Sequence, residues 1–334
     1  MRHFVVVGIL IVILTVLTYV GLSAAGLMPV AASAQAGPID WLWNLEMMTL
    51  SFLAALIVVP MMYSLIVFRR KKGDTEDAEH VEGNTNLEIT WTVLPLFLVM
   101  IFAYLGAGNL SAIRRVDPEA MVVKVTGIQW SWKYEYPAYG VTTTELHIPE
   151  GKQVLLQMTS NDVIHSFWVP EFRVKQDLVP GRITELRITP TMVGNYKVRC
   201  AELCGTSHAY MEGPVVVSTQ ADFDAWMAEQ VKLAAEAAAT PEGRGQALVL
   251  ANGCAACHTT TGAPGIGPTW LGLFGRQEAL TDGSVVTVDD AYLHESIKAP
   301  QAKIVAGFEN QLMPTYGFTD EQINDIIAYL KTIR

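Results

Sequence analysis

The sequence has few of the residues that would mark a disulfide-stabilised or a nucleic-acid-binding protein. Only four cysteines occur among 334 residues, and they lie in two short segments, 200–204 and 254–257. Cysteines grouped in this way argue against a disulfide framework. Cations are also scarce, because 23 Lys and Arg face 33 Asp and Glu and leave a net charge of −10. This acidity argues against a nucleic-acid partner.

Apolar residues, in contrast, are abundant, and the mean hydropathy of +0.28 is too high for a wholly soluble protein. Residues 1–36 combine a basic start, a long apolar run and an Ala-Ser-Ala sequence at 32–34, a pattern typical of a cleaved export signal. Because the apolar run is long enough to cross a bilayer, a first transmembrane segment is the alternative. The apolar runs 45–68 and 89–107 each predict a spanning helix, in which proline is tolerated.

A cluster of cations indicates how these helices are oriented. Arg69, Arg70, Lys71 and Lys72 directly follow the second apolar run. Such clusters mark cytoplasmic loops, so the segments that flank the helix pair are expected outside. We therefore expect a transmembrane helical hairpin over 40–109, with two mature spanning helices in a bacterial plasma membrane. The rest of the chain would lie on the periplasmic side, and the hairpin would pack on a partner and on lipid.

The pattern changes to short alternating apolar runs from Met121 onwards, with turn sequences rich in Pro and Gly between them. This pattern predicts a β-sandwich or barrel over residues 110–219. Residues 220–240 are rich in Ala, Glu and Lys and predict a helical linker. Pro241 then begins a new helix, because proline is favoured at the first helical position. Residues 241–334 are expected to form a separate C-terminal domain.

Soft metal ligands gather in one segment of the β-rich region. Cys200, Cys204, His208 and Met211 fall within twelve residues, and His165 lies upstream. Thiolate, thioether and imidazole groups favour copper or zinc over magnesium or calcium. Two Cys and two His would satisfy zinc, but the methionine would be unexplained, because a thioether is a weak ligand for copper and a poor one for zinc. For the cysteines alone, a disulfide is the alternative.

This segment closely resembles the copper loop of subunit II of haem–copper cytochrome c oxidases, Cys-x-Glu-x-Cys-x-x-x-His-x-x-Met. The resemblance implies a cupredoxin-like sandwich that carries a binuclear copper centre, CuA. It implies the following ligands by position: bridging Cys200 and Cys204, one copper each on His165 and His208, and axial Met211 and the backbone carbonyl of Glu202.

The same resemblance implies three further roles. The side chain of Glu202 would help to hold a magnesium ion at the interface with the catalytic subunit. Trp130, the first Trp of the aromatic run 129–136, would accept electrons from the donor, although such a run is also expected as a packed strand face. Glu88 would help protons to enter a channel in the neighbouring subunit, although a carboxylate there is also expected at a solvated helix N-terminus.

The C-terminal domain contains a second redox motif, Cys-x-x-Cys-His, which is the covalent attachment site of haem c. Cys254 and Cys257 would form the thioether bonds and His258 would be the proximal iron ligand. Met313, before a helix capped at Thr319, is predicted as the sixth ligand, as in small cytochromes c. This similarity implies an all-α cytochrome c domain. A thioredoxin-like Cys pair is the alternative, but the sequence lacks the βαβ pattern that it needs.

Together the two motifs resemble the caa3-type oxidases, and the fold class is multidomain: a transmembrane α-helical hairpin, a cupredoxin-like sandwich and a cytochrome c domain. The resemblance implies a respiratory-chain subunit that accepts electrons through haem c and passes them to CuA. From there they would go to haem a and the haem–copper oxygen site of subunit I, with proton translocation. The chain has no ligand set for that oxygen site. Subunits I and III and an external donor, cytochrome c or another small redox protein, are the expected partners.

Two other functions are considered for the same motifs. The first is the CuA-containing subunit of a nitric oxide reductase, which only the partner subunit would distinguish. The second, from another class, is a copper-delivery or thiol–disulfide assembly protein that uses Cys200 and Cys204. That second function would require neither Met211 nor a haem. Nitrous oxide reductase is excluded, because the seven scattered His cannot supply its additional histidine cluster.

Overall fold

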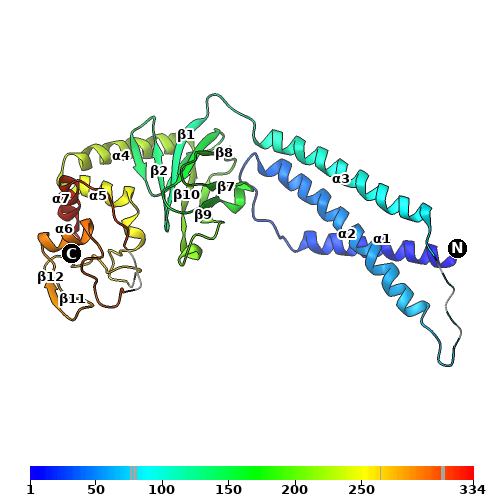
Figure 1. Ribbon diagram of the computed structural model, residues 1–334. Coiled ribbons are helices and arrows are strands. Elements are labelled where there is room, and N and C mark those ends of the chain that lie inside the picture. Colours follow the sequence, from blue (N-terminus) through cyan, green and yellow to red (C-terminus); the bar gives the residue numbers. More distant parts are fainter. Residues whose placement is uncertain (76, 78–79, 81, 264, 310–312) are drawn as a thin grey trace. The chain divides into compact units, whose positions relative to one another are not determined.

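The computed structural model describes residues 1–75, 77, 80, 82–263, 265–309 and 313–334 (Figure 1). The chain forms two compact units, Met1–Arg115 and Val116–Arg334. The first unit contains the apolar helices that the sequence predicts, and the second contains both redox motifs.

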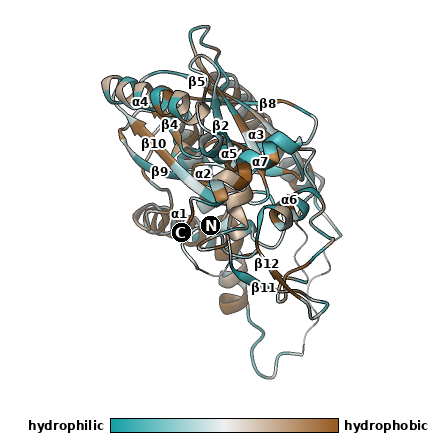
Figure 2. Cartoon of the chain, turned by 90° about the vertical axis from the view of Figure 1, so that its left-hand side faces the viewer, coloured by the Kyte–Doolittle hydropathy of each residue, from teal (hydrophilic) through white to brown (hydrophobic). Residues whose placement is uncertain are grey.

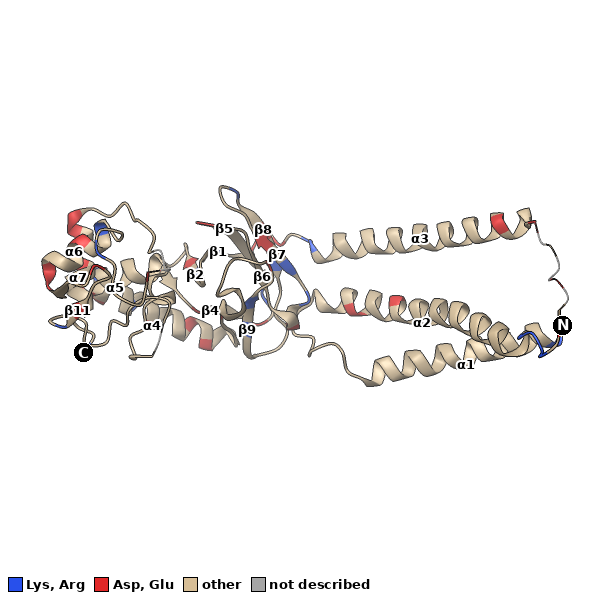
Figure 3. Cartoon of the chain, turned by 60° about the horizontal axis from the view of Figure 1, so that its bottom comes forward, with Lys and Arg blue, Asp and Glu red and all other residues tan. Residues whose placement is uncertain are grey.

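Three long helices make up the first unit: α1 (Arg2–Ala24), α2 (Ala36–Val67) and α3 (Thr85–Ile113). Each is long and apolar enough to cross a membrane, and charged residues are nearly absent along them (Figure 3). Two spanning helices are expected in the mature protein, whereas the described residues contain three apolar helices of spanning length. The third arises because the apolar run near the N-terminus forms a continuous helix of 23 residues, longer than a bilayer requires.

The helix α1 packs along α2 in the antiparallel sense. Nδ1 of His3, at the start of α1, lies 2.7 Å from the hydroxyl of Tyr63, and its ring contacts the ring of Phe68 with centroids 5.3 Å apart. At the opposite end of the unit, Nδ2 of Asn109 in α3 donates to the carbonyl of Pro38 in α2 at 3.3 Å. Successive helices of this unit thus run in opposite directions.

Two five-stranded sheets form the sandwich of the second unit, with strand orders β3-β2-β1-β5-β8 and β4-β10-β9-β6-β7. The strands are β1 (Met121–Ile128), β2 (Ser131–Tyr136), β3 (Val141–Thr143), β4 (Leu146–Pro149), β5 (Val154–Ser160), β6 (His165–Trp168), β7 (Lys175–Leu178), β8 (Thr184–Ile188), β9 (Gly194–Cys200) and β10 (Glu212–Ser218). The pairs β1–β5 and β4–β10 are parallel and the others antiparallel. The predicted all-β sandwich is confirmed.

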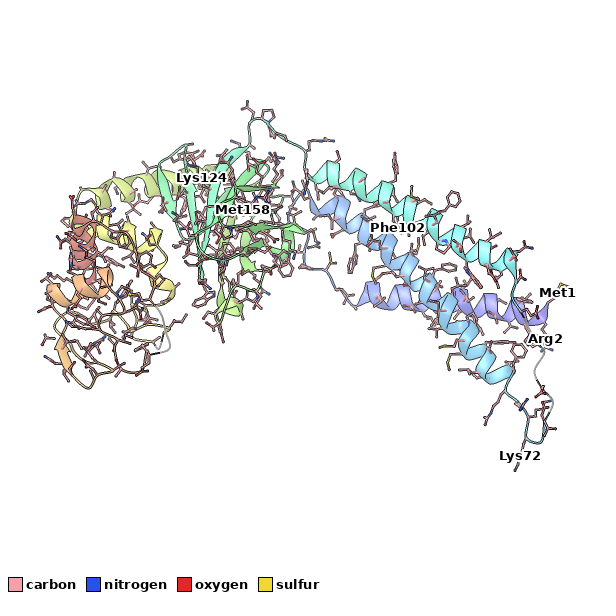
Figure 4. All side chains as sticks on the ribbon, viewed as in Figure 1. Met1, Arg2, Lys72, Phe102, Lys124 and Met158 are labelled. Atoms are coloured by element: carbon pink, nitrogen blue, oxygen red, sulfur yellow. The ribbon has the colours of Figure 1, made fainter. Side chains whose placement is uncertain are left out.

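Alternate residues of β2 and β5 are buried, among them Met158, which is labelled in Figure 4. Met158 of β5 is fully buried, and the inward residues of β2 are Trp132, Tyr134 and Tyr136. Trp130, expected on that same face, precedes β2 instead, because the chain turns between β1 and β2. The short strands β3 and β7 were not predicted, since three or four residues carry little periodic signal.

The rest of the second unit is mainly helical. Its helices are α4 (Gln220–Ala238), α5 (Pro241–Ala251), α6 (Asp290–Lys298) and α7 (Asp320–Leu330), and a small hairpin joins β11 (Gln277–Ala279) to β12 (Val285–Thr287). Short 3₁₀ turns cover Pro170–Phe172 (η1), His208–Tyr210 (η2) and Cys254–Ala256 (η3). Thr319 and Gln322 cap α7 reciprocally, as predicted. Hydrophobic and hydrophilic residues share the surface of α4 (Figure 2), consistent with its predicted role as a linker.

The C-terminal domain depends on a close crossing of α5 and α7. Gly245 of α5 is buried, and a Cβ at this position would overlap the backbone oxygen of Asp325 in α7. The neighbouring Arg244 donates from Nε and Nη2 to the two carboxylate oxygens of Asp325, at 2.8 and 2.7 Å. A residue without a side chain is therefore needed where the two helices touch.

Replacing Gly245 by Ala is expected to force α5 and α7 apart. Such overpacking lowers the free energy of unfolding by about 1–3 kcal/mol. Hydrogen exchange of α7 amides in the full chain measures this loss, and Gln246→Ala, at an exposed position of the same helix, is the control. Equal protection of α7 in both variants would contradict the predicted overlap.

Candidate metal centres

The first candidate centre lies on a loop that the second sheet holds at both ends. Strand β9 ends at Cys200, β10 begins at Glu212, and the amide of Cys200 donates to the carbonyl of Met211 at 3.0 Å. The adjacent amide of Ala201 donates to the carbonyl of Ser166 in β6 at 2.9 Å. Because β6 begins at His165, the same pairing sets this histidine beside the loop. The backbone thus brings together ligands that are 35 residues apart.

All the predicted copper-binding groups converge at this loop. The two sulfurs, Sγ of Cys200 and Sγ of Cys204, lie 3.7 Å apart. The sulfur of Cys200 is 3.9 Å from Nδ1 of His165 and 3.2 Å from the carbonyl of Glu202. The sulfur of Cys204 is 3.5 Å from Nδ1 of His208 and 3.8 Å from Sδ of Met211. Met211 and His165 are almost completely buried. The cysteines are free, so a disulfide is absent from the described thiols. Two sulfurs flanked by two imidazoles and two weaker donors fit a pair of soft metal ions.

The structure adds one residue that the sequence analysis missed. Oδ1 of Asp162 lies 2.8 Å from Nε2 of His165, and Oδ2 accepts from the backbone N–H of Gln129 at 2.7 Å. In the neutral imidazole, Nε2 donates to this carboxylate and Nδ1 carries the lone pair that faces Cys200. The signal available in the sequence was an acidic residue three positions before the histidine. Asp162 therefore orients a metal ligand.

The protein groups around the loop give the two thiols different pKa values. Burial lowers the pKa of His165, but hydrogen bonds with Asp162 and Cys200 outweigh it and raise this pKa to about 9. Burial raises the pKa of Cys200, but hydrogen bonds with His165 and with backbone groups outweigh this effect and lower the pKa to about 6. Burial and the neighbouring Cys200 raise the pKa of Cys204 to about 12. Cations bound between the sulfurs would favour both thiolates.

The predicted electron acceptor, Trp130, contacts the same loop. Its indole Nε1 donates to the carbonyl of Cys204 at 3.2 Å, and Nε2 of Gln129 donates to the same oxygen at 2.7 Å. Gly205 follows in a left-handed conformation, and a Cβ there would lie 3.1 Å from the Trp130 ring. The indole is therefore joined to the copper loop by a direct hydrogen bond and by close packing.

The second candidate centre is a cavity of about 510 Å³ in the C-terminal domain. The four residues predicted to hold haem all line it, namely Cys254, Cys257, His258 and Met313. Apolar side chains make up much of the remaining wall: Val249, Trp270, Leu273, Tyr292, Leu293, Ile297, Ile326 and Leu330. An apolar cavity with two thiols, an imidazole and a thioether fits a covalently bound porphyrin with two axial ligands.

The surroundings of His258 fix its orientation. Its Nδ1 donates to the carbonyl of Pro268 at 2.7 Å, so Nε2 is free to bind a metal. The ring of Trp270 stacks on it with centroids 5.0 Å apart and planes at 11°. A Cβ on Gly267 would lie 2.7 Å from the imidazole, so glycine is required there. Burial lowers the pKa of His258, despite the bond to Pro268, and thereby favours the neutral, ligating form.

The other predicted site residues lie apart from these two clusters or only partly within them. Glu88 is exposed in the first turn of α3, beside the cap formed by Asn84, which accepts from the amide of Leu87 at 3.1 Å. Glu202 is exposed, and its backbone carbonyl rather than its carboxylate is the group that faces Cys200.

Three family models match successive parts of the chain. The transmembrane domain of cytochrome c oxidase subunit II matches residues 21–106, its periplasmic domain matches 141–220, and cytochrome c matches 243–334. A cytochrome c oxidase subunit 2 from Alkalihalophilus pseudofirmus is 31% identical over 307 residues, which cover 88% of each chain. The chain belongs to the cytochrome c oxidase subunit II family.

Other proteins are similar to parts of the chain. A subunit 2 from Synechocystis is 34% identical over 252 residues, or 61% of this chain and 75% of the relative. The crystal structure of the periplasmic domain of subunit II from Bradyrhizobium japonicum is 32% identical and covers 35% of this chain and 98% of its own, with a TM-score of 0.34.

The family matches account for both metal centres and for the place of the chain in an enzyme. The cytochrome c match implies haem c, and the periplasmic-domain match together with the His, Cys and Met cluster implies CuA. As a subunit II with a cytochrome c domain, the chain is a membrane protein and one subunit of a cytochrome c oxidase. These matches favour neither the nitric oxide reductase nor the assembly-protein alternative.

Asp162→Asn is expected to loosen copper binding while leaving the dicopper spectrum recognisable. Loss of the carboxylate makes His165 a less basic ligand, and such changes reduce metal affinity about 10- to 100-fold. Removing a negative charge also favours reduction, so the copper potential should rise. Copper retention against a chelator and a redox titration measure the two effects. The control Glu185→Gln neutralises an exposed carboxylate on β8 and should change neither copper retention nor the copper potential. If it changes both as much as Asp162→Asn does, Asp162 does not act through His165.

Proposed function

We propose that this subunit II takes electrons from an external donor through haem c in residues 241–334 and passes them to CuA in residues 110–219. From CuA they would continue to haem a and the haem–copper oxygen site of subunit I, coupled to proton translocation. The observation that carries this proposal is the convergence of two thiols 3.7 Å apart with imidazole and thioether groups in one buried loop.

In this proposal Cys200 and Cys204 would both bind the copper pair, with His165 holding one ion and His208 the other. Met211 and the carbonyl of Glu202 would be weak ligands. The pair would supply single-electron transfer. The contribution of the protein is rigidity: both ends of the loop are hydrogen-bonded to neighbouring strands, so the donor atoms move little when the charge on the metal changes.

For the haem, Cys254 and Cys257 would be the covalent attachment points, and His258 and Met313 would bind the iron. The hydrogen bond from His258 to Pro268 keeps Nε2 directed at the metal position. Axial ligation by Met and His favours a high reduction potential. The apolar wall around these groups excludes water, which supports the same effect.

Two exposed carboxylates, one in the copper loop and one in α3, have proposed roles at interfaces with partner subunits. The exposed carboxylate of Glu202 would help to hold magnesium against subunit I, and the exposed Glu88 would help protons to enter from the cytoplasmic side. The cations Arg69–Lys72 support a cytoplasmic location for the loop after α2, which leaves both metal domains on the periplasmic face of a bacterial plasma membrane. Subunit III and a small redox protein, such as a cytochrome c, are the other proposed partners.

We divide the chain, as part of this proposal, into five segments. They are the signal or first transmembrane segment 1–36, the helical hairpin 40–109, the CuA domain 110–219, the linker 220–240 and the cytochrome c domain 241–334. The agreement between these limits and the bounds of α4 and α5 supports the last two divisions.

The decisive test for the copper centre is Cys200→Ser in the complete oxidase. Loss of one bridging thiolate should abolish the mixed-valence dicopper signal in electron paramagnetic resonance, whereas the c-type haem band should keep its full intensity. Electrons delivered to the haem should then stay there. A mixed-valence dicopper signal that survives the substitution would exclude the bridging role.

Met313→Ala tests the haem ligand. The haem should remain attached through its thioether bonds, but its potential should fall and the reduced form should bind carbon monoxide readily, because the sixth position opens. The absorption spectrum of the reduced protein with and without carbon monoxide measures this, with the wild-type chain as reference. Binding of carbon monoxide by the wild-type haem would contradict the assignment.

A further inference from the structure

The helix α4, which joins the two redox domains, is packed on the sandwich by an aromatic cluster. The ring of Trp226 stacks on the ring of His147 in β4, with centroids 3.8 Å apart and planes at 1°. The same indole meets the ring of Tyr136 edge-on at 5.8 Å. Phe223 and Met227, one turn apart on this helix face, are 1% and 2% exposed. Because most helical stability in proteins comes from tertiary packing rather than from propensity, this cluster stabilises α4 on the sandwich.

The surface that receives α4 is itself rigid. The hydroxyl of Tyr136 donates to the carbonyl of His147 at 2.9 Å and accepts from the amide of the same residue at 2.8 Å. The imidazole of His147 is further held by Glu145, with Nε2 3.3 Å from Oε2. At the start of α4, Thr219 caps the helix by accepting from the amide of Asp222. These bonds fix both rings of the stack.

Only two residues, Ala239 and Thr240, separate α4 from α5 of the haem-binding domain. Thr240 caps α5 by accepting from the amide of Gly243 at 3.1 Å. A Cβ on Gly243 would overlap the backbone oxygen of Ala237, so the start of α5 lies directly against the end of α4. The orientation of α5, and with it the domain built on the crossing of α5 and α7, is therefore transmitted from α4.

A second contact between the two domains lies beside the haem motif. A Cβ on Gly253, the residue before Cys254, would come within 2.8 Å of Oγ of Ser131 and 3.4 Å of Ile128. The cavity that holds Cys254 and His258 is closed on this side by Gln129, Trp130 and Asp162 of the sandwich. Two of these, Gln129 and Trp130, hydrogen-bond to the copper loop.

We propose that His147 and Trp226, which touch neither metal centre, are positioning residues for electron transfer from haem c to CuA. Their stack anchors α4 as a rigid spacer between the sandwich and the haem-binding domain, whose cavity is lined in part by Trp130. The inference rests on the proposed relay and adds to it the device that sets the distance between its two centres. Because electron tunnelling slows steeply with distance, a loosened α4 slows transfer without altering either metal site.

The test uses the complete, metal-loaded oxidase with Trp226→Ala. Hydrogen exchange of residues 220–238 should accelerate about tenfold or more, because truncating a packed Trp destabilises by more than the 1.4 kcal/mol that a tenfold change requires. After photoreduction of the haem, electron transfer to copper should slow several-fold and become heterogeneous. The dicopper resonance signal and the haem spectrum should match those of the wild type.

Matched variants separate anchoring from general damage. Val231→Ala truncates an apolar side chain on the same helix that is 41% exposed, and it should behave as wild type. His147→Ala removes the other ring and should reproduce the effect of Trp226→Ala, which covers the case in which that variant does not assemble. His147→Phe keeps an aromatic ring and should restore both protection and rate.

The possible results are distinguishable. Unchanged exchange in α4, or an unchanged transfer rate despite faster exchange, overturns the positioning role. If the wild-type oxidase passes no electron from haem to copper, the proposed relay fails, and the exchange data still decide whether the stack anchors α4.

Discussion

The pairing of β6 with β9 is the interaction on which the copper-binding part of this protein depends. It places Phe167 opposite Cys200 and so brings His165 to the base of a loop that begins at the end of β9. The amide of Cys200 closes that loop through the carbonyl of Met211. Donor atoms from distant parts of the sequence thus converge, because backbone hydrogen bonds determine where they lie.

The second sphere around this loop couples it to the haem cavity. Asp162 bonds to His165 and to the amide of Gln129, while Gln129 and Trp130 both donate to Cys204. The same three residues face the cavity that contains the haem motif. The short turn between β1 and β2 therefore holds Asp162 through the amide of Gln129, supports the copper loop and forms part of the wall of the neighbouring cavity.

Rigid attachment distinguishes this arrangement from a redox domain on a flexible tether. The aromatic cluster around Trp226 and the capped junction of α4 with α5 leave little freedom between the two domains of the second unit. A fixed spacing suits a relay within one chain, because the acceptor is always close to the donor. Electron transfer from an external partner to the haem is then confined to surfaces of the haem-binding domain that the sandwich does not cover.

The cofactors of both centres could be predicted from the sequence, because the ligand types and their spacings, Cys200 to Met211 and Cys254 to His258, are local properties of the chain. The apolar helices, the sandwich and the capped α7 could be predicted as well, since their patterns are strong. The support of His165 by Asp162, the turn at Trp130, the packing of α1 on α2 and the stack of Trp226 on His147 are seen only in the folded protein. They depend on how loops, short strands and helices pack against one another, and such packing leaves no periodic signal in the sequence.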